Sequence, residues 1–433
     1  MVLDQSTNIM KVFYDSAIFL YTWGIRLAAL FSSRAQRWTH GRKGIFRKVE
    51  NSGITGEKVV WFHAASLGEF EQGRPVIEAF RKKHPEYKIL LTFFSPSGYE
   101  VRKDYKGADY IFYLPADTKR NALRFIRVVR PVMAVFIKYE FWLNYIASLH
   151  REGIPLIHIS SVFRPDQYFF RGWGGFALKR LRKIERIFVQ DRSSLQLLHS
   201  RGIMNAGISG DTRFDRVHEE RMKNTPVPAI ERWIDERPVV VAGSTWPEDE
   251  SLLIEWIQKY KGRFRFIIAP HEVGEERIQS LIKKTGGSSV ERFSELRDGQ
   301  AGTGDILIID GIGILSRLYK YGFVAFIGGG FGKGIHNILE AVAFGKPVIF
   351  GPVHEKFREA VELTRLGGAF PVRDFSQMES VINRLSADPD YHERCSAICR
   401  NFIEENTGAT EKIMEAVDGI IGSISSRTTV TKE

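Results

Sequence analysis

Two glutamates in the first half of the chain have the position and surroundings of residues that act on protons or charge. Glu69 ends the segment Ser66-Leu-Gly-Glu69, which follows an apolar run and opens a helical pattern. Serine and glutamate at this spacing also form a capping box, which satisfies free N–H groups at a helix start, so a purely structural reading explains the pair. Glu140 follows another apolar run and lies among aromatic residues. A carboxylate there pairs with a cation or has a function, but neither glutamate alone identifies an enzyme.

A glycine-rich segment in the second half has the composition of an anion-binding loop. It follows the apolar run 323–327 and precedes a short helical pattern over 338–344. Glycine lets the backbone approach a ligand closely, and a helix start offers N–H groups to an anion. We therefore predict a phosphate loop, with a glycine-rich turn that binds nothing as the alternative. The glycines are Gly328, Gly329, Gly330, Gly332 and Gly334.

This loop matches neither of two common nucleotide-binding motifs. The P-loop requires Ser or Thr after its Gly-Lys pair, but Gly334 follows Lys333. The dinucleotide fingerprint Gly-x-Gly-x-x-Gly fails as well, because it requires glycine at Lys333 or at Asn337, depending on the register. The sequence therefore argues against a P-loop NTPase and a standard dehydrogenase.

Metal and disulfide sites are not expected. Asp388-Pro-Asp390 is similar to the Asp-x-Asp metal motif of sugar transferases, but its proline favours a turn between two helices. The two cysteines, Cys395 and Cys399, are four residues apart in a helical pattern, with His392 as a neighbouring ligand. We expect a helix face in the core, a reducing compartment, and no metal or cofactor.

These groups need a scaffold, and the sequence predicts two α/β halves. Apolar runs alternate with amphipathic helical stretches, which is typical of parallel sheets covered on both faces. A polar connection without strand character, 216–237, separates the halves. We predict Rossmann-like domains over 36–220 and 221–425, with ligands beyond the carboxyl ends of the strands in a central cleft. The expected strands are 59–65, 89–94, 110–114, 133–137, 156–160, 186–190, 238–243, 264–269, 305–309, 323–328, 347–350 and 368–372.

Residues 12–31 form the most apolar stretch of the chain, interrupted by Asp15 and Arg26. The uncharged run between these two residues is shorter than the roughly 20 residues that span a bilayer. On a helix this stretch has a wide apolar face, and six basic residues without an acidic one follow between 32 and 49. We predict a membrane-anchor helix over 1–35 on an anionic membrane surface. A helix packed on the protein itself is the alternative, and a spanning anchor stays open.

The composition narrows the classes of partner that the chain could bind. At 433 residues with 43% hydrophobic and 12% aromatic residues, the chain can bury full cores, which excludes an intrinsically disordered protein. Its 62 lysines and arginines exceed its 51 acidic residues, for a formal net charge of +11. This excess favours a nucleic acid, a phosphorylated ligand or an anionic membrane. Because no RNA-binding aromatic motif or helix-turn-helix pattern is present, we expect no nucleic-acid partner.

Nine segments in order resemble the 3-deoxy-D-manno-oct-2-ulosonic acid (Kdo) transferases of lipopolysaccharide synthesis. The resemblance extends over nearly the whole chain, and nine ordered segments are far more specific than one. It begins with the membrane-proximal helix. The other segments are His63-Ala-Ala-Ser-Leu-Gly-Glu69, Ser95-Pro-Ser-Gly98, Leu114-Pro-Ala-Asp117, Tyr139-Glu-Phe-Trp142, Gly210-Asp-Thr-Arg-Phe-Asp215, Ala242-Gly-Ser-Thr245, Ala269-Pro-His271 and His336-Asn-Ile-Leu-Glu340.

The resemblance implies a GT-B glycosyltransferase with an amino-terminal acceptor domain and a carboxy-terminal domain for CMP-Kdo. Such an enzyme transfers Kdo, with inversion, to a lipid A precursor (lipid IVA) at the cytoplasmic face of the inner membrane. The family's general base falls on Glu69, and two groups that stabilise the transition state fall on Glu140 and Arg213. The implied nucleotide contacts are Pro270, His271, Ile312, Gly313, Ile314, Asn337, Ile338, Leu339 and Glu340.

The chain departs from the family pattern at several positions. Arg213 replaces a lysine, His271 an arginine and Ile314 a glutamate, while Leu143 and Ile338 replace prolines. A fixed cation thus becomes titratable at His271, and the shape of the cation changes at Arg213. Two alternatives stay open: another GT-B transferase that uses a UDP- or GDP-sugar with a lipid acceptor, and a membrane-bound nucleotide-sensing or RNA-binding protein.

Overall fold

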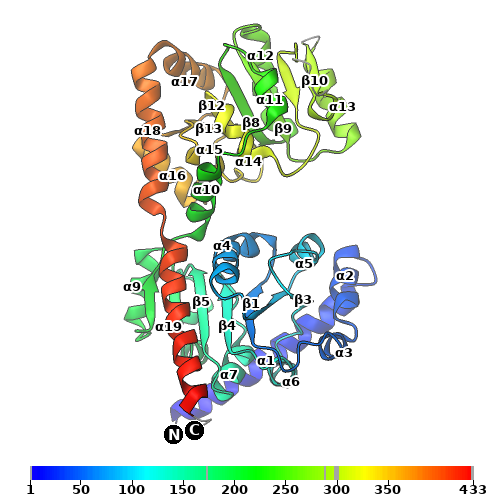
Figure 1. The fold of residues 1–433 in the computed structure, drawn as a ribbon, viewed down its shortest axis with the longest axis vertical. Helices are drawn as coiled ribbons and strands as arrows, with labels where there is room; N and C mark the ends of the chain where they lie inside the picture. The colour runs from blue at the N-terminus through cyan, green and yellow to red at the C-terminus, as the bar shows by residue number, and fades with distance from the viewer. Residues whose placement is uncertain (1, 172–173, 287–288, 297–301, 431–433) are drawn as a thin grey trace. The chain divides into compact units, whose positions relative to one another are not determined.

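The computed structural model describes residues 2–171, 174–286, 289–296 and 302–430, which form two compact units (Figure 1). Unit 1 comprises the residues up to 215 together with those from 407 onward, and unit 2 comprises residues 216–406. The expected boundary at 220 lies close to the observed one. The second domain does not continue to residue 425, however, because the last helix belongs to unit 1.

Unit 1 contains a sheet of seven strands in the order β3-β2-β1-β4-β5-β6-β7. All neighbouring strands are parallel, as predicted. Six strands lie at the predicted positions, and β7, which is three residues long and contains a glycine, is an addition. The strands are β1 Val59–Ala64, β2 Lys88–Phe93, β3 Tyr110–Tyr113, β4 Met133–Ile137, β5 Leu156–Ser161, β6 Arg186–Val189 and β7 Ala206–Ile208.

Both faces of this sheet are buried, which explains why its strands are continuous apolar runs. In β1, Val59 and Trp61 contribute to one apolar cluster, and Val60 and Phe62 contribute to another. The covering helices lie between the strands in sequence, except for the last one. They are α4 Leu67–Lys83, α5 Pro96–Arg102, α6 Lys119–Val129, α7 Leu143–Arg151, α8 Gly175–Leu181, α9 Arg192–Ser200 and α19 Ala409–Val430.

Helix α19 closes unit 1 although it is the last element of the chain. Ile413 and Met414 on one face of α19 belong to the same apolar cluster as the strands. The carboxylate of Asp215 accepts from the backbone N–H groups of Gly408 and Thr410, both at 2.6 Å, and so fixes the start of the helix. The amphipathic pattern of α19 is visible in the sequence, but such a pattern does not indicate which core the helix covers.

The N-terminal segment forms three helices, α1 (Val2–Ala28), α2 (Ser33–Arg42) and α3 (Ile45–Glu50). Helix α1 therefore begins earlier than the apolar stretch, and most of the basic residues that follow lie on α2 and α3. Within the part of the chain that the structure describes, none of the helices combines the length and apolar character needed to cross a bilayer.

One edge of α1 is fixed to the rest of unit 1 by partly buried hydrogen bonds. The Tyr14 hydroxyl donates to Asp117 at 2.5 Å, and the Asn144 amide donates to Asp15 at 2.9 Å. Asp117 also accepts from the backbone N–H groups of Asn144 and Tyr145, at 3.1 and 3.0 Å, at the start of α7. Burial nevertheless raises the pKa of Asp117 to about 6. The alternative of a helix packed on the protein is therefore correct for this edge.

The rest of α1 presents a wide apolar face. The side chains of Phe19, Leu20 and Trp23 are 66%, 64% and 54% exposed, and Phe31 just beyond the helix is 90% exposed. This face is what the sequence analysis expects of a helix that lies on a membrane.

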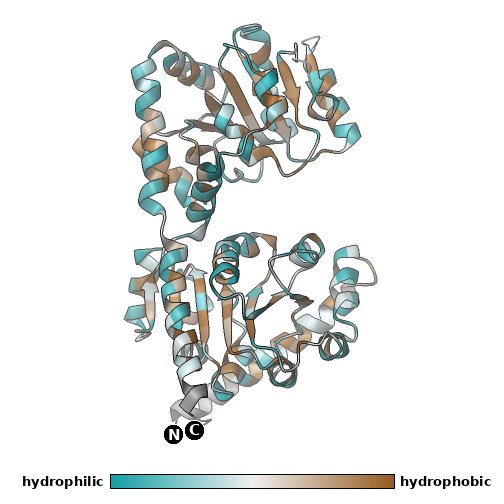
Figure 2. Cartoon of the chain, viewed as in Figure 1, coloured by the Kyte–Doolittle hydropathy of each residue, from teal (hydrophilic) through white to brown (hydrophobic). Residues whose placement is uncertain are grey.

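Unit 2 has a second sheet of seven parallel strands, in the order β10-β11-β9-β8-β12-β13-β14. In both units the strands are mostly hydrophobic, whereas many helical residues are hydrophilic (Figure 2). All predicted strands are present, and the edge strand β10 is an addition. The strands are β8 Val239–Thr245, β9 Arg265–Pro270, β10 Val290–Arg292, β11 Ile306–Ile308, β12 Val324–Ile327, β13 Val348–Phe350 and β14 Ala369–Pro371.

The remaining helices connect these strands or precede them. The polar connection 216–237 contains two helical segments and no strand, as expected. The helices are α10 Thr212–Lys223, which crosses the unit boundary, and α11 Pro228–Trp233, α12 Pro247–Lys259, α13 Glu275–Lys284, α14 Leu315–Leu318, α15 Leu339–Ala343, α16 Arg358–Leu366, α17 Phe375–Ala387 and α18 Pro389–Asn406.

The Asp388-Pro-Asp390 segment and the two cysteines lie where a structural role explains them. Asp388 lies between α17 and α18 and accepts from the backbone N–H of Tyr391 at 2.8 Å, which confirms the helix–helix connection. Cys395 and Cys399 are free and buried on α18, as predicted. Among the described residues, no three His, Cys, Asp or Glu side chains lie close enough together to hold a metal ion.

Candidate active site

Each sheet has one point where the strand order reverses, and ligands of open α/β sheets bind at this point, beyond the carboxyl ends of the strands. In unit 1 the reversal lies between β1 and β4, because the chain builds β2 and β3 on one side of β1 and later strands on the other. Glu69 follows β1 and Glu140 follows β4, so the two predicted glutamates flank this point. In unit 2 the reversal lies between β8 and β12, and the glycine loop follows β12.

Glu140 is buried in a network of hydrogen-bond donors. It is 5% exposed, and its Oε2 lies 2.9 Å from Nε2 of His63 and 2.5 Å from Nε1 of Trp142. On the other side of the imidazole, Nδ1 of His63 lies 2.8 Å from the Thr92 hydroxyl, which accepts from Nε1 of Trp61 at 2.7 Å. Nδ1 also lies 3.0 Å from the carbonyl oxygen of Thr92, which can only accept a hydrogen bond, and Nε1 of Trp142 lies 3.0 Å from Nε2 of His63. The Glu140 carboxylate thus has two hydrogen-bond donors within reach, one on His63 and one on Trp142.

The sequence analysis included His63 in a family segment but gave it no role. Its signal is a histidine in the middle of an otherwise apolar strand, where a buried polar group needs a partner. His63 is fully buried in β1, and β1 pairs with β4, the strand that precedes Glu140.

Backbone strain marks the same edge of the sheet. Lys138, two residues before Glu140, has a φ angle of 68°, and Ser160 near the end of β5 has a φ angle of 55°. Non-glycine residues adopt this left-handed conformation at a cost, and such positions cluster at functional sites. The backbone turn at Lys138 directs the following residues away from the strand.

Glu69 lies in the first turn of α4 and is half-buried. Ser66 is the residue that precedes the helix, but its side chain caps no backbone N–H group; its hydroxyl donates to the Glu69 carboxylate instead. The capping box that would explain the pair structurally is therefore not formed. A carboxylate in the first turn of a helix is stabilised by the helix dipole.

Arg213 is brought to the same edge by α10. The Thr212 hydroxyl donates to the backbone carbonyl of Gln72 on α4, the helix that carries Glu69. The Arg213 guanidinium donates to Asp211 from Nε at 2.9 Å and lies 2.7 Å from it at Nη2. Glu69, Glu140 and Arg213 all belong to unit 1, on elements at the carboxyl end of its sheet.

In unit 2 a stack of three rings lies beside the reversal point. His271 follows β9 and stacks on Trp246, which follows β8, with 4.7 Å between ring centroids, and on His336, with 4.5 Å. Nε1 of Trp246 donates to Nε2 of His336 at 2.9 Å, so this imidazole nitrogen carries no proton. Burial, and then the proximity of His271, lower the pKa of His336. The sequence analysis missed Trp246, although a tryptophan directly after a strand end is a visible signal.

The glycine loop uses most of its N–H groups internally. Gly328 donates to the carbonyl of Gly243 at 2.9 Å, and Gly332 and Gly334 both donate to the carbonyl of Gly329 at 3.0 Å. Gly329 itself donates to the fully buried carboxylate of Asp249 at 2.7 Å. These four N–H groups therefore have partners within unit 2, and the phosphate loop stays a prediction.

Close packing explains part of the glycine content. A Cβ atom on Gly328 would lie 2.2 Å from the carbonyl oxygen of Ser244, and one on Gly330 would lie 2.5 Å from the backbone nitrogen of Gly351. The loop can therefore pass between the ends of β8 and β13 only with glycine at these positions.

The other predicted nucleotide contacts lie at strand ends of unit 2. Pro270 ends β9, and Ile312, Gly313 and Ile314 lie between β11 and α14. Ile312 is 86% exposed, and Gly313 has a φ angle of 91°, which favours glycine.

Helix α15 begins at Leu339, one residue later than expected. The Asn337 side chain accepts from the backbone N–H of Leu339 at 3.2 Å and donates to Glu340 at 3.2 Å. Ile338 and Leu339 are buried, so their side chains belong to the core of unit 2.

Two parallel α/β units with candidate groups at the reversal points have the architecture of GT-B glycosyltransferases and related nucleotide-sugar enzymes. Among solved structures, the UDP-GlcNAc 2-epimerase from Neisseria meningitidis aligns with a TM-score of 0.58 and 16% identity, over 83% of this chain and 99% of that one. This likeness concerns the fold alone.

Sequence comparisons support one family for the chain. Residues 35–216 match the family model described as 3-Deoxy-D-manno-octulosonic-acid transferase (kdotransferase). The chain is 29% identical to the 3-deoxy-D-manno-octulosonic acid transferase of Rickettsia felis, over 76% of this chain and 70% of that protein. It is 24% identical to the enzyme of the same name from Haemophilus influenzae, over 94% of this chain and 97% of that protein. The family model and these relatives support the assignment of the chain to the Kdo transferases, which are glycosyltransferases.

Proposed function

We propose that this chain transfers Kdo from CMP-Kdo to a lipid A precursor, lipid IVA, in the synthesis of the lipopolysaccharide core. The observation that carries the proposal is the pair of carboxylates at the reversal point of unit 1, in a chain whose residues 35–216 match the family model. One carboxylate, Glu140, is buried with two donors, and the other, Glu69, is half-buried with a serine hydroxyl as partner.

Glu69 acts as the general base. An acceptor hydroxyl is a poor nucleophile, so a carboxylate must take its proton as the glycosidic bond forms. Glu69 is the more accessible of the two glutamates, and Ser66 orients it. Attack on the anomeric carbon from the face opposite the departing CMP inverts its configuration.

Glu140 and Arg213 stabilise charge in the transition state. The donor sugar develops positive charge at its anomeric centre, and the fixed carboxylate of Glu140 lowers the energy of that charge. CMP departs with a single phosphate, and Arg213 is the cation that the sequence places there. Because the N–H groups of Gly328, Gly329, Gly332 and Gly334 have partners within unit 2, Arg213 is the charged group that we propose for this stabilisation.

Unit 2 binds the nucleotide. Flat rings such as those of Trp246, His271 and His336 can stack on a pyrimidine or pack against a ribose. The backbone at Pro270, at 312–314 and at 337–340 supplies further contacts. A departing monophosphate does not need the bridging metal that a diphosphate uses, so we propose that transfer continues in the presence of a chelator.

The enzyme works at the cytoplasmic face of the inner membrane. Its acceptor is a lipid, and the exposed apolar face of α1 together with the basic residues of α2 and α3 suits an anionic lipid surface. We propose that α1 lies on the membrane with this face toward the acyl chains.

Replacement of the base is the decisive test. In Glu69→Ala we expect kcat to fall by at least about a thousandfold, in the upper range for the loss of a general base, while the affinity for CMP-Kdo stays within about twofold. Turnover is measured by mass spectrometry of the lipid product, and donor affinity by calorimetry. Glu78→Ala, on the surface of the same helix, is the matched control. Wild-type turnover of Glu69→Ala would refute the assignment.

The donor is tested separately. The wild-type enzyme is incubated with lipid IVA and either CMP-Kdo, a UDP-sugar or a GDP-sugar. We expect a mass increase of the lipid with CMP-Kdo alone. Product from a UDP- or GDP-sugar would instead support the alternative transferase.

A further inference from the structure

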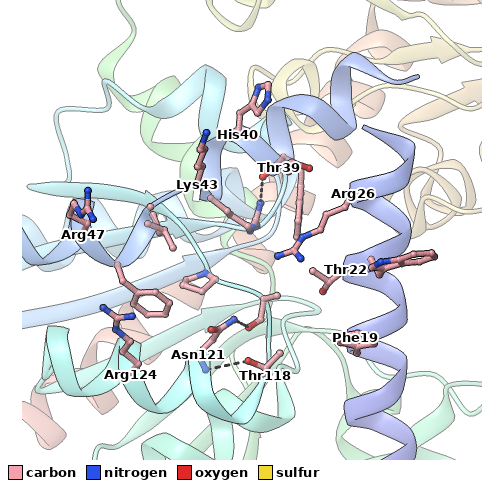
Figure 3. Close-up of a pocket in the computed structure, with 18 of the residues that line it drawn as sticks. Phe19, Thr22, Arg26, Thr39, His40, Lys43, Arg47, Thr118, Asn121 and Arg124 are labelled. Atoms are coloured by element: carbon pink, nitrogen blue, oxygen red, sulfur yellow. Dashed lines mark hydrogen bonds between the residues drawn. The ribbon is translucent and has the colours of Figure 1, made fainter. Parts of the chain in front are cut away.

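A cavity of about 980 Å³ in unit 1 lies between α1, α2, α3 and the start of α6 (Figure 3). Phe19, Thr22 and Arg26 contribute from successive turns of α1, and Arg26 extends toward the opposite helices. The other walls come from α2 and α3 and from the turn that precedes α6, near Thr118. The sequence analysis predicts no cavity here.

The charge of this cavity is strongly positive. Five arginines and lysines line it, against a single carboxylate, Glu50, which pairs with Arg124 at 2.9 Å. Arg26, Lys43 and Arg47 form no ion pair with any residue that the structure describes. Unpaired cations around a concave surface favour an anionic ligand.

The fifth cation, Arg42, builds the inner wall. Its three side-chain nitrogens donate to the backbone carbonyls of Leu114, Trp38 and Phe94, at 2.8, 3.2 and 2.6 Å. It also lies over the Trp38 ring at 3.9 Å. All three side-chain nitrogens of Arg42 therefore have partners within the protein. The cations available to a ligand are Arg26, Lys43 and Arg47.

The cavity also has exposed apolar walls. Phe19 and Trp23 on α1 line it, and they are 66% and 54% exposed. A free phosphate would neutralise the cations but leave these rings in water, whereas a phospholipid offers a phosphate and an apolar body in one molecule. We propose that this cavity binds the phosphate head group of an anionic membrane phospholipid. Phe19 and Trp23 contact its glycerol and acyl region. This inference rests on the proposed attachment of α1 to the membrane.

The cavity lies near the edge of the sheet that carries the candidate catalytic residues. Pro115 and Ala116 in its wall directly follow β3, on the same edge of the sheet as Glu140. The Phe94 ring packs on Trp142, with 4.6 Å between centroids, and Trp142 donates to Glu140. A phospholipid in the cavity would therefore keep the edge that carries the candidate catalytic carboxylates at the lipid surface, where a lipid acceptor is found.

The test compares two kinds of vesicle, without donor or acceptor. Full-length protein is mixed with vesicles of phosphatidylcholine alone, or with one quarter phosphatidylglycerol, and the bound fraction is measured by sedimentation. We expect tighter binding to the anionic vesicles. In the triple variant Arg26→Ala, Lys43→Ala, Arg47→Ala this binding should weaken by about a hundredfold, since each cation near an anionic surface contributes about 1 kcal/mol, or about fivefold. Binding to phosphatidylcholine should not change.

A control of equal charge separates the cavity from general electrostatics. The triple variant Lys261→Ala, Lys283→Ala, Arg365→Ala removes three exposed cations of unit 2 and should bind anionic vesicles nearly as the wild type does. Equal losses in both triple variants would overturn the proposal. Failure of the wild type to bind either vesicle would refute membrane attachment instead, and neither result depends on sugar transfer.

A second experiment tests whether the phosphorylated acceptor, and not a phospholipid, binds in the cavity. The KM for lipid IVA dispersed in detergent, without phospholipid, is measured for the wild type and the cavity variant. We expect the two values to agree within about threefold. A large rise in KM combined with unchanged vesicle binding would assign the cavity to the acceptor and overturn the proposal.

Discussion

The two units have the same sheet architecture, but they place different chemistry at the reversal point of the strand order. In unit 1 this edge carries Glu69, Glu140 and Arg213, with His63 holding a buried carboxylate by a 2.9 Å hydrogen bond. In unit 2 the buried carboxylate near this point is Asp249, and it is bound to the backbone of the glycine loop. Unit 2 instead presents the stacked rings of Trp246, His271 and His336.

This difference teaches that one scaffold can serve two tasks. Glu69 is half-buried and keeps part of its carboxylate accessible, whereas Asp249 is fully buried and shapes a loop. We propose that unit 1 carries the reacting groups and unit 2 recognises the nucleotide. If this division holds, a substitution at the site of one unit should change the task of that unit alone.

The largest effect is expected for Glu140→Gln. The amide keeps the shape of the side chain but loses the negative charge, so we expect kcat to fall by about 10²- to 10³-fold. The affinity for CMP-Kdo should change by less than threefold, as measured by calorimetry. A large loss of donor affinity would mean that unit 1 also recognises the nucleotide and would break the division of tasks.

A smaller loss is expected for His63→Leu, because this histidine acts through Glu140. Without the Nε2–H donor the Glu140 carboxylate loses one of the two groups that fix its position, so kcat should fall by about 10- to 100-fold. His63→Gln, whose amide can donate to Glu140, should recover part of the activity. Equal activities of His63→Leu and His63→Gln would reduce His63 to a packing residue.

In unit 2 the corresponding change is Trp246→Ala. Loss of one ring of the stack should weaken CMP-Kdo binding by about tenfold, since an aromatic contact contributes roughly 1 kcal/mol beyond its buried area. The kcat at saturating donor should change little, and Trp246→Phe should retain most of the affinity. A loss confined to kcat would place Trp246 in the reaction itself.

The smallest effect concerns stability. Burial raises the pKa of Asp117 from 3.8 to about 6, so the folded state holds a proton that the unfolded state has already released at pH 5. The wild type should therefore lose unfolding free energy, of order 2 kcal/mol, as the pH rises from 4 to 7. Asp117→Asn should lack this loss. Urea titrations at both pH values measure the difference, and an equal pH dependence of the two proteins would contradict it.

The fold was largely predictable because buried parallel strands are continuous apolar runs. Twelve strands followed from that pattern, and the two additional ones, β7 and β10, are three residues long and lie at sheet edges, where little apolar surface is buried. The destination of α19 was not predictable, because both units have sheet faces that an amphipathic helix could cover.

The candidate site was predictable in part. Glu69, Glu140 and Arg213 lie on one edge of one sheet, as ordered motifs implied. The hydrogen bonding of the glycine loop was not predictable. The sequence does not reveal that the N–H group of Gly329 donates to Asp249, which lies 80 residues earlier in the chain. His63 and Trp246 likewise acquire meaning only through partners that are distant in sequence.

The placement of α19 has a consequence for synthesis on the ribosome. Unit 2 is one continuous stretch of chain and can complete its core while translation proceeds. Unit 1, which is made first, lacks Ile413, Met414 and Val417 until the end of the chain emerges. A nascent chain that stalls after residue 406 would therefore carry a finished second lobe and an unfinished first one, with apolar surface open to chaperones.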